Sequence, residues 1–191
     1  MARPIWEKET NLDEKFKHLW LENKDGTFLL GQRGYIRMDI KEGEVLSKYC
    51  SLATERVVEI GRRFGGSTWL ISESTNVPVI SIDLTASKLL PFVDKYVESG
   101  QLTLINENSK NVKIDYKYDI LFVDGDHHYN GVKSDIINFW DNLTTAGYAI
   151  FHDYIKDTTE VARAVDELLI DTKRGNVVEH IKSILVIQKI K

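Results

Sequence analysis

The stretch "RVVEIGRRFGGSTWLISEST", from Arg56 to Thr75, contains a complete change of backbone structure. It opens with a short β-branched run, which is typical of a strand buried on both faces. Gly61, Gly65 and Gly66 then predict a turn in which the backbone can approach a ligand closely, and a helix follows from Ser67. A strand that passes through a glycine turn into a helix predicts the opening unit of a parallel α/β sheet.

The rest of the chain repeats this alternation. Further strands are predicted at residues 77–84, 102–106, 118–125 and 147–154, and helices at 85–100, 131–143 and 158–170. Residues 176–190 predict two strands with a reversal near Lys182 and Ser183, so at least one strand must be antiparallel. We therefore predict a Rossmann-like, doubly wound α/β fold: a mostly parallel seven-stranded sheet with an antiparallel terminal strand and helices on both faces.

Residues 1–50 precede the alternation. Helical spacing of apolar residues predicts helices over 12–23 and 40–53, and glycines between them predict a loop. No internal repeat and no proline-rich linker divides the chain. We predict one domain over 1–191, with residues 1–50 as an N-terminal helical extension.

Composition narrows the class of protein. The chain has 191 residues and a formal net charge of −4, which argues against a general nucleic-acid binder, because such proteins show a basic face. Its single cysteine, Cys50, excludes an internal disulfide and a cysteine-based zinc site. No apolar run approaches the ~20 residues of a membrane span, and the first residues lack the apolar core of a signal peptide. We expect a cytoplasmic protein with no membrane or nucleic-acid partner.

An acidic residue follows the second predicted strand in the register of a nucleoside site. Asp83 lies about 20 residues after Gly61, at the strand end where open α/β sheets bind ligands. A carboxylate at this place can accept both hydroxyls of a ribose. The alternative is that Asp83 only caps the following helix, but the combination with the glycine turn favours a nucleoside site.

The spacing of the glycines indicates which kind of nucleoside-containing cofactor the site would bind. Glu59, Gly61 and Gly65 give acid-x-Gly-x-x-x-Gly, which differs from the dinucleotide fingerprint G-x-G-x-x-G. The pattern resembles the first motif of the class I S-adenosylmethionine-dependent methyltransferases, and the closing strand pair is similar to theirs. The resemblance implies that Glu59 and the turn hold the methionine part, Asp83 the ribose, and Asn106 or Ser109 the adenine. The implied cofactor contacts are Glu59, Gly61, Gly65, Gly66, Ser67, Asp83, Asn106, Ser109, Asp124 and Asp126.

Titratable residues follow the fourth and fifth predicted strands, in "DGDHHYN" and "FHDY". These strand ends resemble those of metal-dependent small-molecule O-methyltransferases, namely the macrolide-sugar and cephalosporin-hydroxylase-like families. Asp124 and His127 match their Asp-x-x-His, and Asp153 matches the second residue of their acidic pair. His152 departs from the pattern, since an acid is expected there. The implied metal ligands are Asp124, His152 and Asp153; Mg²⁺ prefers oxygen ligands, whereas histidine suits Mn²⁺, Fe²⁺ or Zn²⁺.

The resemblance implies O-methylation of a small hydroxylated acceptor by a divalent metal (Mg²⁺ or Mn²⁺), a histidine base, or both. Asp124, His127 and His152 are the implied catalytic residues, because a metal lowers the pKa of a hydroxyl and a neutral histidine can take its proton. Two other hypotheses stay open: a nucleoside-binding domain without catalysis, and an NAD-dependent oxidoreductase. Residues 1–50 are expected to cover the acceptor side of the site.

Several conspicuous residues have simpler explanations. Arg62 and Arg63 are expected to be exposed turn residues, although one of them could face an anionic substrate. His128 is expected to be solvated, and Tyr129 and Trp140 to serve in packing. The sequence does not identify the acceptor substrate or the oligomeric state. Members of the family that it resembles often form dimers, so the resemblance allows a homodimer.

Overall fold

The computed structural model describes residues 12, 16, 36–86, 89 and 91–190. The helix predicted over 12–23, and most of the loop that should follow it, lie outside these residues. Among the described residues of this region, Phe16 packs edge-on against Trp69, with ring centroids 5.4 Å apart.

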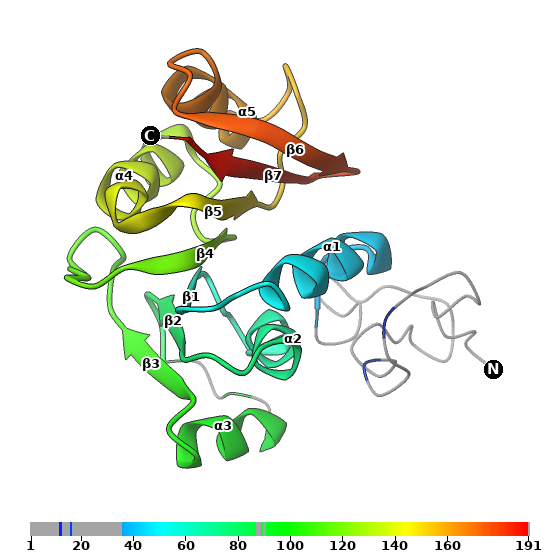
Figure 1. Cartoon of the computed structure of the whole chain (residues 1–191), viewed down its shortest axis with the longest axis vertical. Coiled ribbons are helices and arrows are strands. Elements are labelled where there is room, and N and C mark those ends of the chain that lie inside the picture. The colour runs from blue at the N-terminus through cyan, green and yellow to red at the C-terminus, as the bar shows by residue number, and fades with distance from the viewer. Residues whose placement is uncertain (1–11, 13–15, 17–35, 87–88, 90, 191) are drawn as a thin grey trace.

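A seven-stranded sheet forms the centre of the described chain, in the order β3-β2-β1-β4-β5-β7-β6 (Figure 1). Its strands are β1 (Val57–Ile60), β2 (Val79–Asp83), β3 (Leu102–Asn106), β4 (Tyr118–Val123), β5 (Leu143–Phe151), β6 (Gly175–Ile181) and β7 (Ile184–Lys189). β7 pairs antiparallel with both β5 and β6, whereas the pairings among β1 to β5 are parallel. The predicted topology and the reversal at Lys182 and Ser183 are confirmed; β5 begins at Leu143 rather than at Gly147.

The helical segments fall near their predicted places. They are α1 (Ile40–Cys50), α2 (Gly66–Ser74), η2 (Pro91–Val93), α3 (Asp94–Glu98), α4 (Tyr129–Phe139), η3 (Trp140–Asn142), α5 (Glu160–Val165) and η4 (Asp166–Ile170), a π-helical turn. α1 begins with a capping box: the Asp39 carboxylate accepts the Lys41 N–H at 2.9 Å, and Glu42 accepts the Asp39 N–H at 2.7 Å. Of the helix predicted over 85–100, the described residues are helical over 91–98 and non-helical at 85, 86, 89, 99 and 100.

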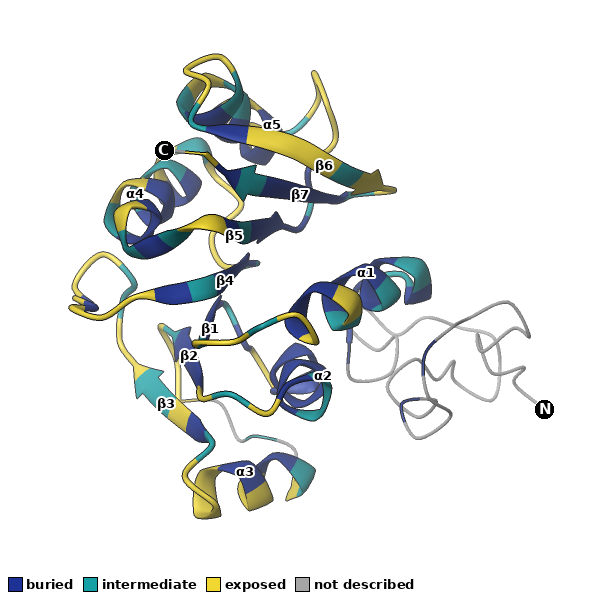
Figure 2. Cartoon of the chain, in the orientation of Figure 1, coloured by how far each residue is buried: buried dark blue, intermediate teal, exposed yellow. Residues whose placement is uncertain are grey.

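Successive residues of the central strands point to opposite faces of the sheet and into two separate cores. Val57 packs with α1, α2 and α3, whereas Val58 packs with α4 and α5. β1, β2 and β7 are accordingly buried along most of their length (Figure 2), as expected for strands covered on both faces. The prediction of helices on both faces is confirmed.

Residues 107–117 connect β3 to β4 without a helix. Val112 and Ile114 of this loop pack into the core beside α4. The Asn138 side chain on α4 donates to the carbonyl oxygens of Ser109 and Val112 at 2.7 and 2.8 Å. The loop therefore has a defined position at the carboxyl end of the sheet, where its first residues help to form a cavity.

Candidate functional site

A cavity of about 660 Å³ lies at the carboxyl ends of the central strands. This volume falls in the range of small-molecule sites, roughly 300–1,000 Å³. The predicted site residues that line it are Gly61, Gly66, Ser67, Asp83, Ser109, Asp124, Asp126, His127, His152 and Asp153. Glu59, Gly65 and Asn106 lie outside this lining. The sheet topology therefore brings most of the predicted residues to one place.

The turn after β1 depends on Gly61. Its φ of 90° lies in the left-handed region, and a Cβ atom there would sit 2.1 Å from the backbone oxygen of Asp124. The Gly61 N–H donates to the Ile82 carbonyl, and the Asp124 N–H donates to the Ile60 carbonyl, each at 2.8 Å. Glycine at position 61 thus allows the turn to lie directly against the backbone at the end of β4.

Glu59 is fully buried beneath this turn. Its carboxylate accepts the hydroxyls of Ser67 and Thr68 at 2.6 Å each, and that of Ser81 at 2.5 Å. Burial raises the pKa of Glu59 to about 7, although the three hydroxyls favour the ionised form. Glu59 therefore fixes the start of α2 against β2 from behind the cavity wall. Its part in ligand binding stays a prediction, and in this geometry it would act through Ser67.

Asp83 organises the same turn from β2. Its Oδ2 accepts the N–H groups of Arg62 and Arg63 at 3.0 and 2.8 Å, and its Oδ1 accepts the N–H and hydroxyl of Thr85. Burial opposes ionisation, but the hydrogen bonds from Thr85, Arg63 and Arg62 outweigh it and lower the pKa of Asp83. The carboxylate lines the cavity, so a ligand hydroxyl can replace the Thr85 hydroxyl at Oδ1.

The prediction of two exposed arginines is wrong for Arg62, whose exposed fraction is 3%. Its guanidinium donates to the carbonyls of Ser81 and Ile105 at 2.9 and 3.0 Å, and to the side-chain oxygen of Asn106. The ends of β2 and β3 present these acceptors, which attract the side chain inward. Arg63 is exposed and lines the cavity, so the alternative of an anionic substrate stays a prediction for this residue.

Sequence analysis missed Asp135, a cavity-lining acid on α4 with an exposed fraction of 2%. Its Oδ1 accepts the Ser109 hydroxyl at 2.6 Å. Burial raises the pKa of Asp135 to about 6, and the neighbouring Asp126 adds to the rise. A signal was available, because helical spacing places Asp135 on the same face as the buried Val132 and Phe139.

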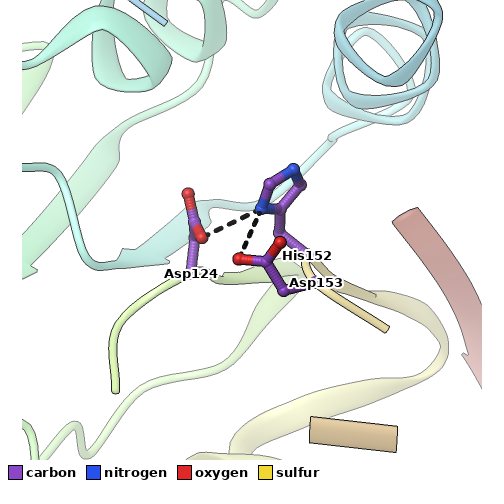
Figure 3. A group of neighbouring side chains, drawn as sticks. All are labelled: Asp124, His152 and Asp153. Atoms are coloured by element: carbon purple, nitrogen blue, oxygen red, sulfur yellow. Dashed lines mark hydrogen bonds and ion pairs between the residues drawn. The ribbon is translucent and has the colours of Figure 1, made fainter. Parts of the chain in front are cut away.

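The ends of β4 and β5 bring together three side chains whose donor atoms could hold a metal ion (Figure 3). Nδ1 of His152 lies 3.2 Å from Oδ1 of Asp124 and 3.2 Å from Oδ2 of Asp153. One donor atom from each residue lies within 4.8 Å of the other two. One nitrogen and two carboxylate oxygens at this spacing suit a divalent transition cation.

His127 lies beside this cluster. Its Nδ1 is 3.3 Å from Oδ2 of Asp153, and its Nε2 is 3.6 Å from Oδ1 of Asp124. The hydrogen bond with Asp124 raises the pKa of His127, against the opposing effect of burial. Asp153 adopts a left-handed φ of 56°, a strained conformation that occurs at functional sites.

The strongest electrostatic effect in the cluster falls on His152. Burial disfavours its charged form, but hydrogen bonds with Asp124, Asp153 and Glu42 raise its pKa to about 12. Burial likewise opposes ionisation of Asp124, yet His127 and His152 lower its pKa. The carboxylates thus create a strong preference for positive charge at this point, which fits a bound cation.

Glu42 is a second residue that sequence analysis missed. It lies on α1, is 3% exposed, and its Oε2 is 3.4 Å from Nε2 of His152. Sequence analysis placed α1 in the N-terminal extension and assigned it no site residue.

Among the residues given simpler explanations, His128, Tyr129 and Trp140 behave as predicted. The His128 side chain is 85% exposed and contacts Asp126 at 2.8 Å. Trp140 is fully buried, and Tyr129 is partly buried against the same core.

Comparison with known proteins identifies the family. The family described as a methyltransferase domain matches residues 58–154, which is half of the chain and contains both the glycine turn and the cluster of Asp124, His152 and Asp153. The chain belongs to this methyltransferase family. It is a class I S-adenosylmethionine-dependent methyltransferase, and this decides against the two other hypotheses.

Solved structures share the fold of this methyltransferase. The O-methyltransferase NovP aligns with a TM-score of 0.66 and 15% identity over 83% of each chain. A methyltransferase from Podospora anserina, bound to S-adenosylhomocysteine, gives a TM-score of 0.62 with 16% identity over 82% of this chain and 80% of its own. The N-methyltransferase NodS from Bradyrhizobium japonicum gives a TM-score of 0.60, with 14% identity over 79% of this chain and 95% of its own. At these identities the likeness shows the fold.

Among curated proteins, an uncharacterized protein of Acanthamoeba polyphaga mimivirus is 36% identical over 59 residues. The match covers 30% of this chain and 27% of the mimivirus protein. Within the described part of the methyltransferase, no helix has the length and apolar character needed to cross a bilayer.

Proposed function

We propose that this methyltransferase transfers a methyl group to a hydroxyl of a small acceptor, with a divalent cation held by Asp124, His152 and Asp153. The observation that carries the proposal is the convergence of these donors within 4.8 Å, in a ligand-sized cavity that the glycine turn also lines. A cation held beside the methyl donor would suit an acceptor hydroxyl that must lose its proton.

The proposed cofactor site occupies the side of the cavity formed by β1, β2 and the loop after β3. The turn from Gly61 to Ser67 would hold the methionine part, Asp83 the ribose, and Ser109 with Asp126 the adenine end. Glu59, Gly65 and Asn106 would support these contacts from outside the lining. The S-adenosylhomocysteine bound in the Podospora anserina neighbour supports this choice of cofactor.

In the proposed reaction, a bound cation would supply Lewis acidity that lowers the pKa of the acceptor hydroxyl. His127 would accept the hydroxyl proton on a ring nitrogen. The hydroxyl oxygen forms a bond to the sulfonium methyl carbon, the carbon–sulfur bond breaks, and its electron pair stays on sulfur to give S-adenosylhomocysteine. The remaining task of the protein is alignment, which the strand ends and the glycine turn provide.

The acceptor would enter beside the segment that precedes α1. Ile36, Arg37 and Met38 line the cavity, and α1 follows directly with Glu42 against His152. We propose that the N-terminal region forms the acceptor-side cover on this basis. A cytoplasmic location and a homodimer stay predictions from the sequence.

Calorimetry with S-adenosylhomocysteine tests the cofactor site. Asp83→Ala should weaken binding by about tenfold or more, because the ribose loses a charged acceptor. Thr85→Val is the matched control, since it removes one hydroxyl that donates to Asp83 but keeps the carboxylate. Equal affinity of the parent and Asp83→Ala would exclude the ribose assignment.

Metal dependence is tested with labelled S-adenosylmethionine and a panel of small hydroxylated compounds. Transfer should stop with EDTA and return with Mn²⁺. Asp124→Asn and Asp153→Asn should each abolish the stimulation by metal while the melting temperature stays near that of the parent. Activity that is insensitive to EDTA would remove the metal from the proposal and leave a histidine-based mechanism.

A further inference from the structure

Glu42 connects α1 to the proposed metal-binding cluster through a fixed set of hydrogen bonds. Its Oε2 accepts the Asp39 N–H at 2.7 Å and lies 3.4 Å from Nε2 of His152. Its Oε1 accepts the N–H and the hydroxyl of Ser183, in the turn between β6 and β7, at 2.8 and 2.6 Å. Donors from α1 and from this turn thus hold the buried carboxylate in place.

The two ring nitrogens of His152 face different partners: Nε2 lies 3.4 Å from Glu42, and Nδ1 lies 3.2 Å from both Asp124 and Asp153. Both positions favour an N–H, because an ionised carboxylate only accepts hydrogen bonds. A cation held by Asp124 and Asp153 would take the place of the proton at Nδ1, while Nε2–H donates to Glu42, since a neutral imidazole has one N–H and the hydrogen bond at one nitrogen selects the tautomer.

We propose that Glu42 is a positioning residue that presents Nδ1 of His152 as a ligand, and that the site consequently takes a transition cation such as Mn²⁺ or Co²⁺ in preference to Mg²⁺. The inference rests on the metal part of the proposed function. Imidazole suits transition cations, whereas Mg²⁺ is bound by carboxylates, phosphates and waters. Partners that orient a ligating histidine are commonly worth about 10–100-fold in metal affinity.

Glu42 also has a purely structural explanation, because it completes the capping box of α1 and docks the β6–β7 turn. Glu42→Gln tests the positioning role. With its amide oxygen toward Ser183, the amide nitrogen takes the place of Oε2 and donates toward His152, a contact that favours the tautomer whose Nδ1–H faces the cluster and blocks coordination. The same nitrogen cannot accept the Asp39 N–H, so the variant also weakens the capping box; Asp39→Ala, which removes the other half of the box and leaves Glu42 in place, measures that structural cost alone.

The experiment uses the full chain after removal of metal with EDTA. Titration calorimetry with MnCl₂ and MgCl₂ gives the two affinities, and visible absorption of the Co²⁺-loaded protein reports the ligand set. The parent should bind Mn²⁺ at least about tenfold more tightly than Mg²⁺. Glu42→Gln should lose about 10–100-fold in Mn²⁺ affinity and change the Co²⁺ spectrum, with a smaller effect on Mg²⁺.

Ser183→Ala is the matched control, because it removes a hydroxyl from the same carboxylate and leaves its charge. It should keep the Mn²⁺:Mg²⁺ preference of the parent. The inference is overturned if Glu42→Gln keeps the parental Mn²⁺ affinity and Co²⁺ spectrum, if Ser183→Ala causes an equal loss, or if the parent does not prefer Mn²⁺. Titration with S-adenosylhomocysteine distinguishes this inference from the proposed function. If the parent binds Mn²⁺ but shows no preference over Mg²⁺, or if Glu42→Gln has no effect, this inference alone is overturned. If the parent binds the cofactor but no Mn²⁺, the metal part of the proposed function falls as well, and if it binds neither, the proposed function falls as a whole.

Discussion

The burial of Asp135 predicts a specific dependence of stability on pH. In the folded protein burial raises the pKa of this carboxyl from its ordinary 3.8 to about 6, so the folded state holds the proton more tightly than the unfolded state. The stabilising contribution of the protonated carboxyl is complete below the unfolded pKa and is lost as the pH rises through about 6. Its full size is about 3 kcal/mol, since one pH unit corresponds to about 1.4 kcal/mol.

Asp135→Asn removes this titration and keeps an oxygen that can accept the Ser109 hydroxyl. The free energy of unfolding of the variant, minus that of the parent, should increase by about 2–3 kcal/mol between about pH 4 and about pH 7. This difference cancels the titration of groups that do not interact with Asp135, so its pH dependence reports Asp135 and its coupling to Asp126.

Urea unfolding in EDTA, followed by tryptophan fluorescence, measures the difference, because Trp69 and Trp140 are buried in the two cores. Ser109→Ala is the control: it keeps the carboxyl and should keep the parental direction of the pH dependence. A constant difference between Asp135→Asn and the parent across this range would refute the assignment of a raised pKa.

Three further substitutions test the turn and the base. Gly61→Ala should abolish S-adenosylhomocysteine binding in calorimetry, because its Cβ would collide with the Asp124 backbone, whereas Gly100→Ala, with nothing within 4 Å of its Cβ, should bind normally. Glu59→Ala should lower the urea-measured free energy of unfolding by about 3 kcal/mol or more, since it leaves three buried hydroxyls without their acceptor; an unchanged value contradicts this role. His127→Ala should slow transfer from labelled S-adenosylmethionine by about 10²–10⁴-fold with unaltered cofactor affinity, and near-parental turnover would exclude it as the base.

The fold could be predicted because its signals are local. A buried strand such as Leu121–Val123 needs a continuous apolar run, and the turn after β1 needs glycine where φ is positive. The alternation with helices then predicts parallel strands, whose carboxyl ends lie at one edge of the sheet, and β4 and β5 pair as neighbours there. The convergence of Asp124, His127, His152 and Asp153 could therefore be predicted from the sequence.

The roles of residues that depend on partners far away in the sequence could not be predicted. Glu42 is separated from His152 by 110 positions, and its local pattern is already explained by the capping box. Arg62 follows a strand and would be solvated if the ends of β2 and β3 did not offer carbonyl acceptors. In each case the neighbouring sequence already accounts for the residue, as a capping-box glutamate or as an exposed turn arginine. The additional contact becomes visible only in the folded structure.

The position of β7 has a consequence for biosynthesis. β7 lies between β5 and β6 and supplies Ile184 and Val186 to one core, and Leu185 and Ile187 to the other. While the ribosome is still synthesising the segment before β7, β5 has an unpaired edge and both cores lack a wall. Such edges recruit other strands, and partly folded chains aggregate through them. The nascent chain is therefore exposed to aggregation through the β5 edge until β7 has emerged and paired with it.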